Sequence, residues 1–371
     1  MSAQCSTDSD GGTVPYSRVL HGRPAPRHPP ANFDQAIRLP QSLVNEFKQA
    51  GICDHTWEQL RCGGVVLTTD YSGSGTAELA MAMIGMGLAD VDMALSNEKI
   101  AMPWCKYYRA CDSDDVCRYV VSKHTPDTRP VHIMDDMLKR VDAGTRELMG
   151  RWLTQALKKF QDAAAQGHRR RSVLVELHGR KFAKKVWAHL ETIEVEQTAP
   201  CHSCNDNCKV HPSSEERAGR RYMNASGNVC VPWSSLGSRM GWLHEATLVF
   251  LVWLKDIIEA LPDVVAQECV CNFDSELMNE LIQDKYLQQS CTTCPSMFGL
   301  PVHRRRKYSI CIRKDLLVFD VPWPPGFLTS FFRREVLTSA KIYFRAPQSI
   351  VEKHLCALAD KRGCRIQNIN N

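Results

Sequence analysis

The segment VVLTTDYSGSGTAELAMA, residues 65–82, has the pattern of a strand, a glycine turn and the start of a helix. Val65-Val66-Leu67 is a short apolar run, and the run from Thr76 onward has a helical pattern. Gly73 and Gly75 lie between them, where small residues let a ligand approach the backbone and where the helix start offers unpaired N–H groups. A plain strand-to-helix turn would have the same pattern, so the glycines alone do not decide between the two.

Short apolar runs and helical patterns alternate outward from this segment. We expect strands or helices at YYRAC (107–111), SDDVCRYVVSKH (113–124, helix), PVHIM (130–134), ATLVFLVWLKDIIEAL (246–261, helix), DVVAQECV (263–270) and YSICIRK (308–314). Strands that alternate with helices indicate a parallel sheet covered on both faces. The sequence therefore predicts an α/β fold with a doubly wound, mostly parallel, Rossmann-like sheet.

Three regions depart from this alternation. Residues 1–38 are rich in Pro, Gly, Ser and Arg, which predicts a disordered lead-in. Residues 141–222 are polar, basic and helical in pattern, and we interpret them as a cysteine-containing helical insertion in a domain that spans residues 60–313. Residues 314–371 begin irregularly, with VPWPPGF, and are interpreted as a tail or part of another module.

Composition narrows the class of protein. Of 371 residues, 44% are hydrophobic and 23% charged, as in ordinary soluble globular proteins, and the net charge of +5 permits nucleic acid as a partner without requiring it. The start MSAQCSTDSDGG lacks a secretory signal, so we expect the 17 cysteines to be reduced thiols or metal ligands. The most apolar window, Ala246 to Leu254, is far shorter than the roughly 20 residues of a membrane span. We therefore expect an intracellular protein that is neither secreted nor inserted in a membrane.

Acidic residues follow the second and third predicted strands. Asp112 directly follows Cys111, and an acid at that edge suits the two hydroxyls of a ribose. Asp136 follows the third strand, where a carboxylate can reach an adenine amino group. Either acid alone could be a helix N-cap, but two of them past a glycine turn favour an adenosine ligand. Neither the GxxxxGK[ST] phosphate loop nor the complete GxGxxG motif is present, so S-adenosylmethionine, which has no pyrophosphate, is the expected ligand.

The stretch GNVCVPWSSLG, residues 227–237, places Cys230 among turn-forming residues. A structural cysteine usually lies within an apolar element, and that is the default interpretation of any one of the 17 cysteines. The Gly, Pro and Ser residues around Cys230 instead predict a turn that presents the thiol.

Five segments, in this order along the chain, resemble motifs of the cytosine-5 DNA methyltransferase family. They are Tyr71-Ser72-Gly73-Ser74-Gly75 for F-x-G-x-G, Asp112 and Asp136 for the acidic ribose and adenine contacts, Val229-Cys230-Val231-Pro232-Trp233-Ser234 for P-C-x-x-[FW]-S, Gln267-Glu268-Cys269-Val270 for E-N-V, and residues 299–306, GLPVHRRR, for G-x-P-Q-x-R-x-R. The resemblance implies a methyltransferase catalytic domain at residues 60–313 and a partial target-recognition region or tail at residues 314–371.

The resemblance also implies a role for each motif. Cys230 would add as a thiolate to carbon 6 of cytosine, and Glu268 would protonate or hydrogen-bond ring N3. Arg304 and Arg306 would steady the adduct and nearby phosphates. The methyl donor, S-adenosylmethionine, would bind to residues of the glycine turn and to the two acids, namely Tyr71, Ser72, Gly73, Ser74, Gly75, Asp112 and Asp136. The target base would be flipped out of a duplex into the pocket.

Three residues differ from the family pattern. Val229, Cys269 and Val302 replace Pro, Asn and Gln, and nothing after residue 313 resembles the family's last motif. We therefore expect a divergent member and leave a truncated one open. The preferred substrate is DNA, in the nucleus or another intracellular compartment. The same chemistry on RNA, and a catalytically silent nucleic-acid-binding relative, remain as alternatives.

A second cysteine cluster lies inside the insertion. Cys201, Cys204, Cys208 and His211 form C-x2-C-x3-C-x2-H, and four such ligands can surround one zinc ion tetrahedrally. Chance clustering in a cysteine-rich chain is the alternative. We interpret Cys291 and Cys294 as structural.

Overall fold

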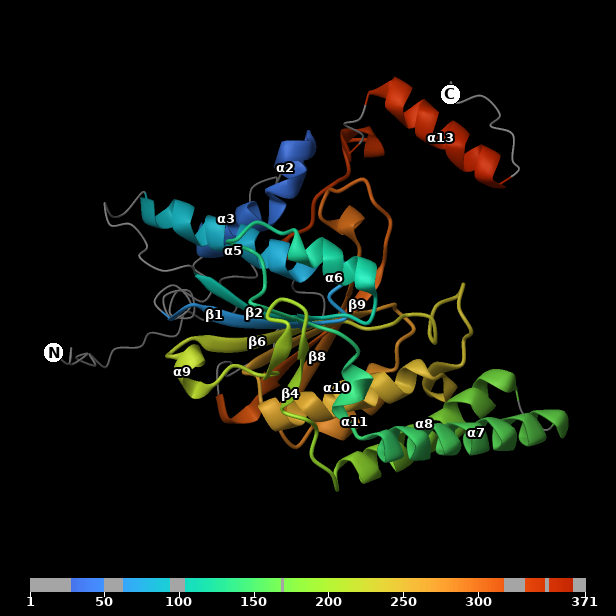
Figure 1. The fold of residues 1–371 in the computed structure, drawn as a ribbon. Coiled ribbons are helices and arrows are strands. Elements are labelled where there is room, and N and C mark those ends of the chain that lie inside the picture. The colour runs from blue at the N-terminus through green and yellow to red at the C-terminus, as the bar shows by residue number, and fades with distance from the viewer. Residues whose placement is uncertain are drawn as a thin grey trace.

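The computed structural model describes residues 28–49, 63–93, 104–167, 170–316, 331–343 and 347–362. Within these residues, nine strands form one sheet in the spatial order β5-β4-β3-β2-β1-β6-β7-β9-β8 (Figure 1). The strands are β1 (Val65–Asp70), β2 (Cys105–Cys111), β3 (His132–Met134), β4 (Thr198–Cys201), β5 (Asp206–Lys209), β6 (Arg221–Gly227), β7 (Val264–Cys269), β8 (Tyr286–Thr293) and β9 (Arg306–Arg313).

The central strands are parallel, and antiparallel strands flank them. Strands β3, β2, β1, β6 and β7 run in one direction. Strand β9 lies antiparallel between β7 and β8, and at the other edge β4 and β5 form an antiparallel hairpin beside β3. Because the chain adds strands outward from β1 and then outward from β6, the strand order reverses between β1 and β6. The sheet is therefore doubly wound, as predicted, and its topological switch point lies between β1 and β6.

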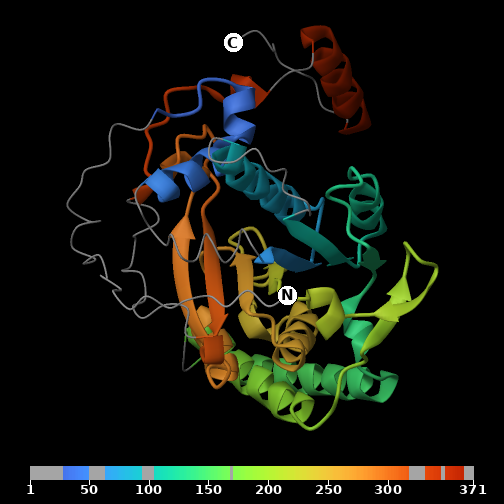
Figure 2. The same ribbon diagram turned by 90° about the vertical axis from the view of Figure 1, so that its left-hand side faces the viewer.

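Helices cover both faces of the sheet (Figures 1 and 2). One face carries α3, α5 and α6, and the other carries α10, α11 and the α7–α8 pair. The α-helices are α2 (Phe33–Ile37), α3 (Leu39–Gln49), α5 (Thr76–Met93), α6 (Asp115–Ser122), α7 (Ala143–Ala165), α8 (Arg171–Leu190), α9 (Ser214–Arg217), α10 (Ala246–Ala260), α11 (Ser275–Ile282) and α13 (Gln348–Arg362). The short 3-10 helices are η1 (Met137–Arg140), η2 (Gly241–Leu243), η3 (Pro295–Met297), η4 (Lys314–Leu316) and η5 (Ala340–Tyr343).

Burial on both faces explains why the central strands are apolar. All six residues of β1 are buried, as expected for a central strand of a covered parallel sheet. In β7, buried and half-buried residues alternate. Leu251, Val252, Trp253 and Leu254 of α10 are each 0% exposed, so this helix is enclosed around a full turn.

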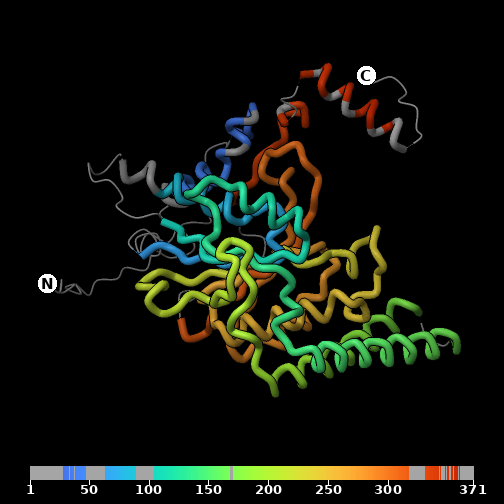
Figure 3. Tube along the Cα trace, viewed as in Figure 1, coloured from blue at the N-terminus to red at the C-terminus, as the bar shows by residue number. Residues whose placement is uncertain are grey.

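The predicted insertion, residues 141–222, contains both helices and strands. The chain runs away from the sheet along α7 and returns along α8, as Figure 3 traces. After α8, the β4–β5 hairpin extends the sheet before the chain reaches β6. The sequence did not predict this hairpin, because TAPC and DNCK are short and mostly exposed and carry no apolar alternation.

Two other details differ from the sequence-based expectations. The predicted disordered lead-in, residues 1–38, includes α2, which begins at Phe33 because the Asn32 side chain caps it by accepting from the N–H of Gln35; residues 1–27 lie outside the described ranges. Strand β8, YLQQSCTT, was not predicted because its polar sequence has no strand pattern, and it forms by pairing with β9.

Among the described residues, no helix has the length and apolar character that crossing a bilayer would require.

Candidate functional site

The first half of the sheet brings three predicted elements to one edge. Parallel strands β1, β2 and β3 end side by side, so the residues that follow them lie along the same edge. Tyr71 begins the glycine turn after β1, Asp112 follows β2, and Asp136 lies two residues beyond β3.

The second half brings the remaining predicted residues to the same edge. The loop with Cys230 follows β6, and Glu268 is the penultimate residue of β7. Arg306 is the first residue of β9, which is antiparallel to β7, so it also lies at this edge. Gly227 joins the two halves: a Cβ built on it would lie 3.4 Å from the carbonyl oxygen of Tyr71 and 3.8 Å from Oε2 of Glu268.

Left-handed backbone shapes the turn after β1. The φ angles of Tyr71, Gly73 and Gly75 are 52°, 55° and 80°. A Cβ on Gly75 would lie 2.2 Å from Cε1 of His124, and Nε2 of His124 is 2.9 Å from the carbonyl oxygen of Ser74. Position 75 therefore requires glycine. A tyrosine with positive φ is uncommon, and such backbone strain is concentrated at ligand-binding segments.

The Asp112 carboxylate stabilises this turn through hydrogen bonds. Its Oδ2 accepts from the N–H of Gly73 at 2.8 Å, and its Oδ1 accepts from the N–H of Asp114 at 2.9 Å. The N-cap of α6 is Asp114 rather than Asp112, so capping does not explain Asp112. Each carboxylate oxygen has a second lone pair, which leaves Asp112 able to accept hydrogen bonds from a ligand hydroxyl.

Asp136 does cap a helix. Its Oδ1 accepts from the N–H of Leu138 at 2.9 Å, at the start of η1. The neighbouring Asp135 forms an ion pair with Lys139, with 2.6 Å between Oδ2 and Nζ. The capping bond uses one lone pair of one Asp136 oxygen, so the half-buried carboxylate keeps acceptor capacity for a ligand.

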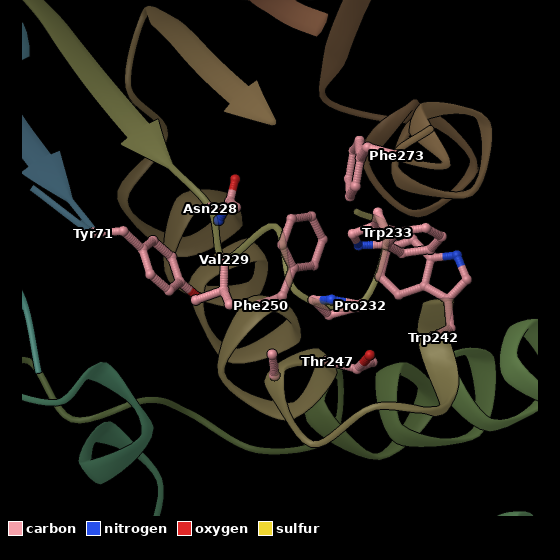
Figure 4. A pocket seen from close by; sticks show the side chains of 10 residues that line it. Tyr71, Asn228, Val229, Pro232, Trp233, Trp242, Thr247, Phe250 and Phe273 are labelled. Atoms are coloured by element: carbon pink, nitrogen blue, oxygen red, sulfur yellow. The ribbon is translucent and has the colours of Figure 1, made fainter. Parts of the chain in front are cut away.

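A pocket lies between the glycine turn and the Cys230 loop. Figure 4 shows Tyr71 on one side of it and Trp233, Trp242 and Phe273 on the other. The space between these side chains opens to solvent. The lining residues are Tyr71, Asn228, Val229, Pro232, Trp233, Trp242, Ala246, Thr247, Phe250 and Phe273.

Two polar side chains of this pocket have unsatisfied atoms. The Tyr71 hydroxyl and both amide atoms of Asn228 are buried without a well-oriented hydrogen-bond partner, although the two side chains are close neighbours. Burial raises the pKa of Tyr71, so its hydroxyl remains a neutral donor. Buried polar groups are nearly always hydrogen-bonded, so a polar ligand here would satisfy them. A hydroxyl donor and an amide that can both donate and accept suit the polar groups of a ligand such as S-adenosylmethionine.

The loop after β6 forms a tight turn that starts at Cys230. The Cys230 carbonyl accepts from the N–H groups of Trp233 at 3.0 Å and Ser234 at 2.8 Å. A Cβ on Gly237 would lie 2.0 Å from the carbonyl oxygen of Val231, so the loop can close only on a glycine. Cys230 is half-buried in this turn.

Aromatic packing anchors the same loop. The Trp233 ring lies 5.1 Å from the Trp242 ring and 5.3 Å from the Phe273 ring, centroid to centroid. Trp242 donates from Nε1 to Asp274 at 2.9 Å. The loop is thus held three residues beyond Cys230 by packing against η2 and the segment before α11.

Glu268 and Arg306 form an ion pair across β7 and β9. Nε of Arg306 lies 2.8 Å from Oε1 of Glu268, and both side chains are partly exposed. The backbone carbonyl of Glu268 also accepts from the N–H of Asn228 at 3.1 Å, which ties β7 to the start of the Cys230 loop. The pair therefore lies beside the Cys230 loop.

Arg304 and Cys269 belong to the same two motifs as Arg306 and Glu268 but lie outside the ion pair. Arg304 is exposed and precedes β9, and the ion pair with Glu268 is formed by Arg306. Cys269 is 1% exposed, and its Sγ contacts the Asn228 carbonyl oxygen at 3.9 Å. Cys269, which stands where the E-N-V motif has Asn, thus contacts the start of the Cys230 loop.

The predicted metal cluster requires one correction. Cys201, Cys204 and Cys208 do come together, but their histidine neighbour is His132 of β3. His211 lies elsewhere: Nδ1 is 3.0 Å from the Tyr222 hydroxyl and Nε2 is 2.9 Å from Asp256. His211 is therefore not a ligand, because a buried carboxylate and a phenol occupy both of its ring nitrogens.

Sequence analysis missed a buried charge network below the site. Arg109 pairs with Asp70 at 2.7 Å, and Arg140 pairs with Asp256 at 2.6 Å. His211 contacts the second oxygen of Asp256. The only sequence signal was an arginine within the otherwise apolar end of the YYRAC strand.

No protein-family model and no curated protein matches this chain. Similar solved structures include Spodoptera frugiperda DNMT2 (15% identity over 71% of this chain and 53% of that chain, TM-score 0.32). The S. pombe Dnmt2 methyltransferase (14%, 70% and 52%, 0.32) and the Entamoeba histolytica methyltransferase EhMeth (13%, 71% and 56%, 0.34) are also similar. The chain spans about half the length of these structures. At such TM-scores the fold assignment depends on the observed strand order.

Proposed function

We propose that this protein transfers a methyl group from S-adenosylmethionine to carbon 5 of cytosine in DNA, with Cys230 as the nucleophile. One observation carries the proposal. The glycine turn and the two acids reach the switch point from one half of the sheet, and Cys230, Glu268 and Arg306 reach it from the other half. Ligands of doubly wound sheets bind at this position.

Cys230 would supply the nucleophile that cytosine chemistry needs. Carbon 5 of cytosine is too weakly nucleophilic to attack a methyl sulfonium. Addition of the Cys230 thiolate to carbon 6 would form a C–S bond and convert the ring into an enamine. Its electrons at carbon 5 would take the methyl group as the S–CH3 bond of the sulfonium breaks, which leaves S-adenosylhomocysteine as the neutral thioether. Loss of the carbon 5 proton then drives the electron pair back to break the C–S bond, which regenerates both the aromatic ring and the thiolate.

Glu268 would act on the opposite side of the ring. Protonation or hydrogen bonding of ring N3 stabilises the charge that develops as sulfur adds to carbon 6. Because Arg306 engages Oε1, the remaining oxygen, Oε2, is the one that would face the base. The exposed Arg304 would contact phosphates.

The other half of the site would bind the methyl donor. S-adenosylmethionine supplies the methyl group as an electrophilic sulfonium. Asp112 would accept from the ribose hydroxyls and Asp136 from the adenine amino group. The buried Tyr71 hydroxyl and Asn228 amide lack a well-oriented hydrogen-bond partner, and they would hydrogen-bond to the remaining polar groups of S-adenosylmethionine.

A cytosine inside a duplex cannot reach a site at a sheet edge. The base would therefore be flipped out of the stack, at a cost of a few kcal/mol in lost stacking and pairing. This substrate implies that the protein acts in the nucleus or in another intracellular compartment that holds DNA.

Covalent trapping tests the proposal. The 371-residue protein is incubated with S-adenosylmethionine and a DNA duplex that contains 5-fluorocytosine, with a matching RNA in parallel. Fluorine cannot leave as the proton does, so the expected result is a covalent adduct, seen by intact mass as protein plus DNA plus one methyl group. Cys230→Ala should give no adduct, whereas Cys356→Ala, which changes an exposed cysteine of α13, should react like the wild type.

Other outcomes would change the assignment. An adduct on RNA alone would replace DNA by RNA as the substrate. An adduct that persists in Cys230→Ala would overturn the role of Cys230. Nucleic-acid binding without any adduct would leave a catalytically silent relative.

A further inference from the structure

Four potential metal ligands converge where the insertion returns to the sheet. His132 is the first residue of β3, Cys201 is the last residue of β4, Cys204 lies in the hairpin turn, and Cys208 lies in β5. One ligand atom from each lies within 4.8 Å of every other. Three of these residues are close in sequence, but His132 is separated from them by α7 and α8.

The distances fit tetrahedral coordination of one ion. Nδ1 of His132 is 3.7 Å from Sγ of Cys201 and 3.5 Å from Sγ of Cys204. With Zn–S bonds of about 2.3 Å and a Zn–N bond of about 2.0–2.1 Å, tetrahedral angles place ligand S and N atoms about 3.6 Å apart. The observed separations match that edge length without any rearrangement.

The hairpin turn orients its sulfurs as a chelating loop does. The carbonyl of Cys201 accepts from the N–H of Asn205 at 2.9 Å, and Asn205 has φ 55°, a left-handed conformation that asparagine tolerates better than most residues. The turn brings Cys204 back beside Cys201, so that Sγ of each contacts Nδ1 of His132.

The β4–β5 hairpin has little apolar burial to hold it in place. Three of the four residues of β5 are exposed, and in β4 only Cys201 is buried. The hairpin joins β3 through the pairing of Met134 with Cys201. Short strands with so little buried surface need another source of stability, and metal ligation can supply it.

Neighbouring groups hold His132 and the hairpin together. The Tyr108 ring packs edge-on against the His132 ring at 5.0 Å. The Tyr108 hydroxyl contacts the carbonyl oxygens of Lys209 at 3.3 Å and His211 at 3.1 Å. The N–H of His202 donates to the Ile133 carbonyl at 2.7 Å. Support of a ligand by residues behind it is typical of built metal sites.

We propose that His132, Cys201, Cys204 and Cys208 bind one Zn²⁺ as a closed structural site. A Cys3His set fills all four positions of the ion, so the site has no catalytic water. The ion joins the start of β3 to the end of the insertion and thereby closes the long loop that contains α7 and α8. The proposal is independent of the methyl-transfer function, because none of the four residues belongs to the proposed donor site or to the Cys230 loop.

Metal analysis of the purified full chain tests the site. Any affinity tag is removed, the protein is dialysed against metal-free buffer, and zinc is counted by mass spectrometry of the elements. The expected content is about one zinc per chain, with roughly tenfold less in Cys204→Ser and in His132→Ala. Cys117→Ser, which changes a half-buried cysteine of α6, should keep the full content.

Cobalt substitution makes the test independent of how well each variant folds. Co²⁺ in place of zinc should give the visible bands of a tetrahedral ion with thiolate charge transfer. Removal of the ion with a chelator should lower the melting temperature of the wild type and leave that of Cys204→Ser unchanged. His211→Gln separates the two candidate histidines, since it should retain the cobalt spectrum.

Three results would overturn the proposal. They are a wild-type protein that is free of metal yet melts at the same temperature with and without added zinc, full zinc content in His132→Ala, and a disulfide between Cys204 and Cys208 in the freshly purified protein.

Discussion

Glu268 and Arg306 form an ion pair at which the proposed chemistry can be separated from the stability of the fold. Arg306 holds one oxygen of Glu268 at 2.8 Å, beside a loop that Glu268 also fixes through its backbone carbonyl. The side chain can therefore change without loss of the backbone hydrogen bond. Removal of its charge should alter the chemistry far more than the fold.

We predict that Glu268→Gln slows covalent trapping by about 10²–10⁴-fold, the usual contribution of a general acid or base. The free energy of unfolding should fall by no more than about 1 kcal/mol, because the pair is partly exposed. Trapping rates and urea unfolding measure the two effects. Glu147→Gln, on the exposed surface of α7, is the control, and equal rates in the two variants would remove Glu268 from the mechanism.

Single residues were predictable only where a sequence motif carries them. The glycine turn, Cys230, Glu268 and Arg306 were singled out by motifs, and the structure brings them to one edge of the sheet; their roles stay predictions. His132 could not be predicted, because a lone histidine in a strand carries no sequence signal and its partners lie beyond two helices. His211 completed the number of ligands in C-x2-C-x3-C-x2-H, but the buried Asp256 engages it. Local spacing therefore predicts ligands only when no distant residue competes for them.

Among the elements, α8 supports the Cys230 loop through Trp242. A Cβ on Gly179 would lie 3.0 Å from Cβ of Trp242 and 3.3 Å from the backbone N of Leu243. Trp242 in turn packs against Trp233, three residues after Cys230. The insertion is thus part of the support for the loop.

We predict opposite effects of two alanine substitutions on this helical pair. Gly179→Ala should lower the free energy of unfolding by about 1–2 kcal/mol, because α8 must move away from η2. Gly150→Ala, at a position of α7 where a Cβ meets nothing within 4 Å, should raise it by up to about 1 kcal/mol. Urea unfolding compares them. A stabilising Gly179→Ala would mean that η2 adapts and that the contact does not hold the loop.

Elements with strong patterns were predicted, and elements that depend on partners were not. The apolar strands at Val65, Cys105 and Val264 form where expected. The polar β8 forms because β9 lies beside it, and the polar β4–β5 hairpin adds to an existing edge. Such strands acquire their structure from tertiary pairing, which the local sequence does not encode.

For the molecule as a whole, the buried charge network joins the sheet to the helices below it. Asp256 of α10 lies between Arg140, Arg109 and His211 and is 0% exposed. Burial opposes ionisation of this carboxyl, but Arg140, His211 and Arg109 outweigh burial and hold the pKa of Asp256 far below its usual range. The charged form is therefore part of the folded state.

We predict that Asp256→Asn lowers the free energy of unfolding by about 3–5 kcal/mol at neutral pH, because it leaves buried arginines unpaired. A carboxyl whose folded pKa is depressed stabilises the protein fully above its unfolded pKa of about 3.9 and progressively less below it. The difference in the free energy of unfolding between wild type and Asp256→Asn should therefore be constant above about pH 5 and shrink as the pH falls below about 4. Urea unfolding at a series of pH values measures it. Asp284→Asn, at an exposed site, should follow the wild type, and a pH-independent difference would contradict the assignment.

The α7–α8 insertion divides the chain into the same two halves that meet in the sheet at the switch point between β1 and β6. Residues up to Gly167 carry the glycine turn and both acids, and residues from Arg170 onward carry Cys230, Glu268 and Arg306. A break at the tip of the α7–α8 pair would thus yield two complementary fragments. Each would be inert alone, and they would reassemble along β1 with β6, β3 with β4 and α7 with α8. Under the proposed function, catalytic output would then report the meeting of two polypeptides.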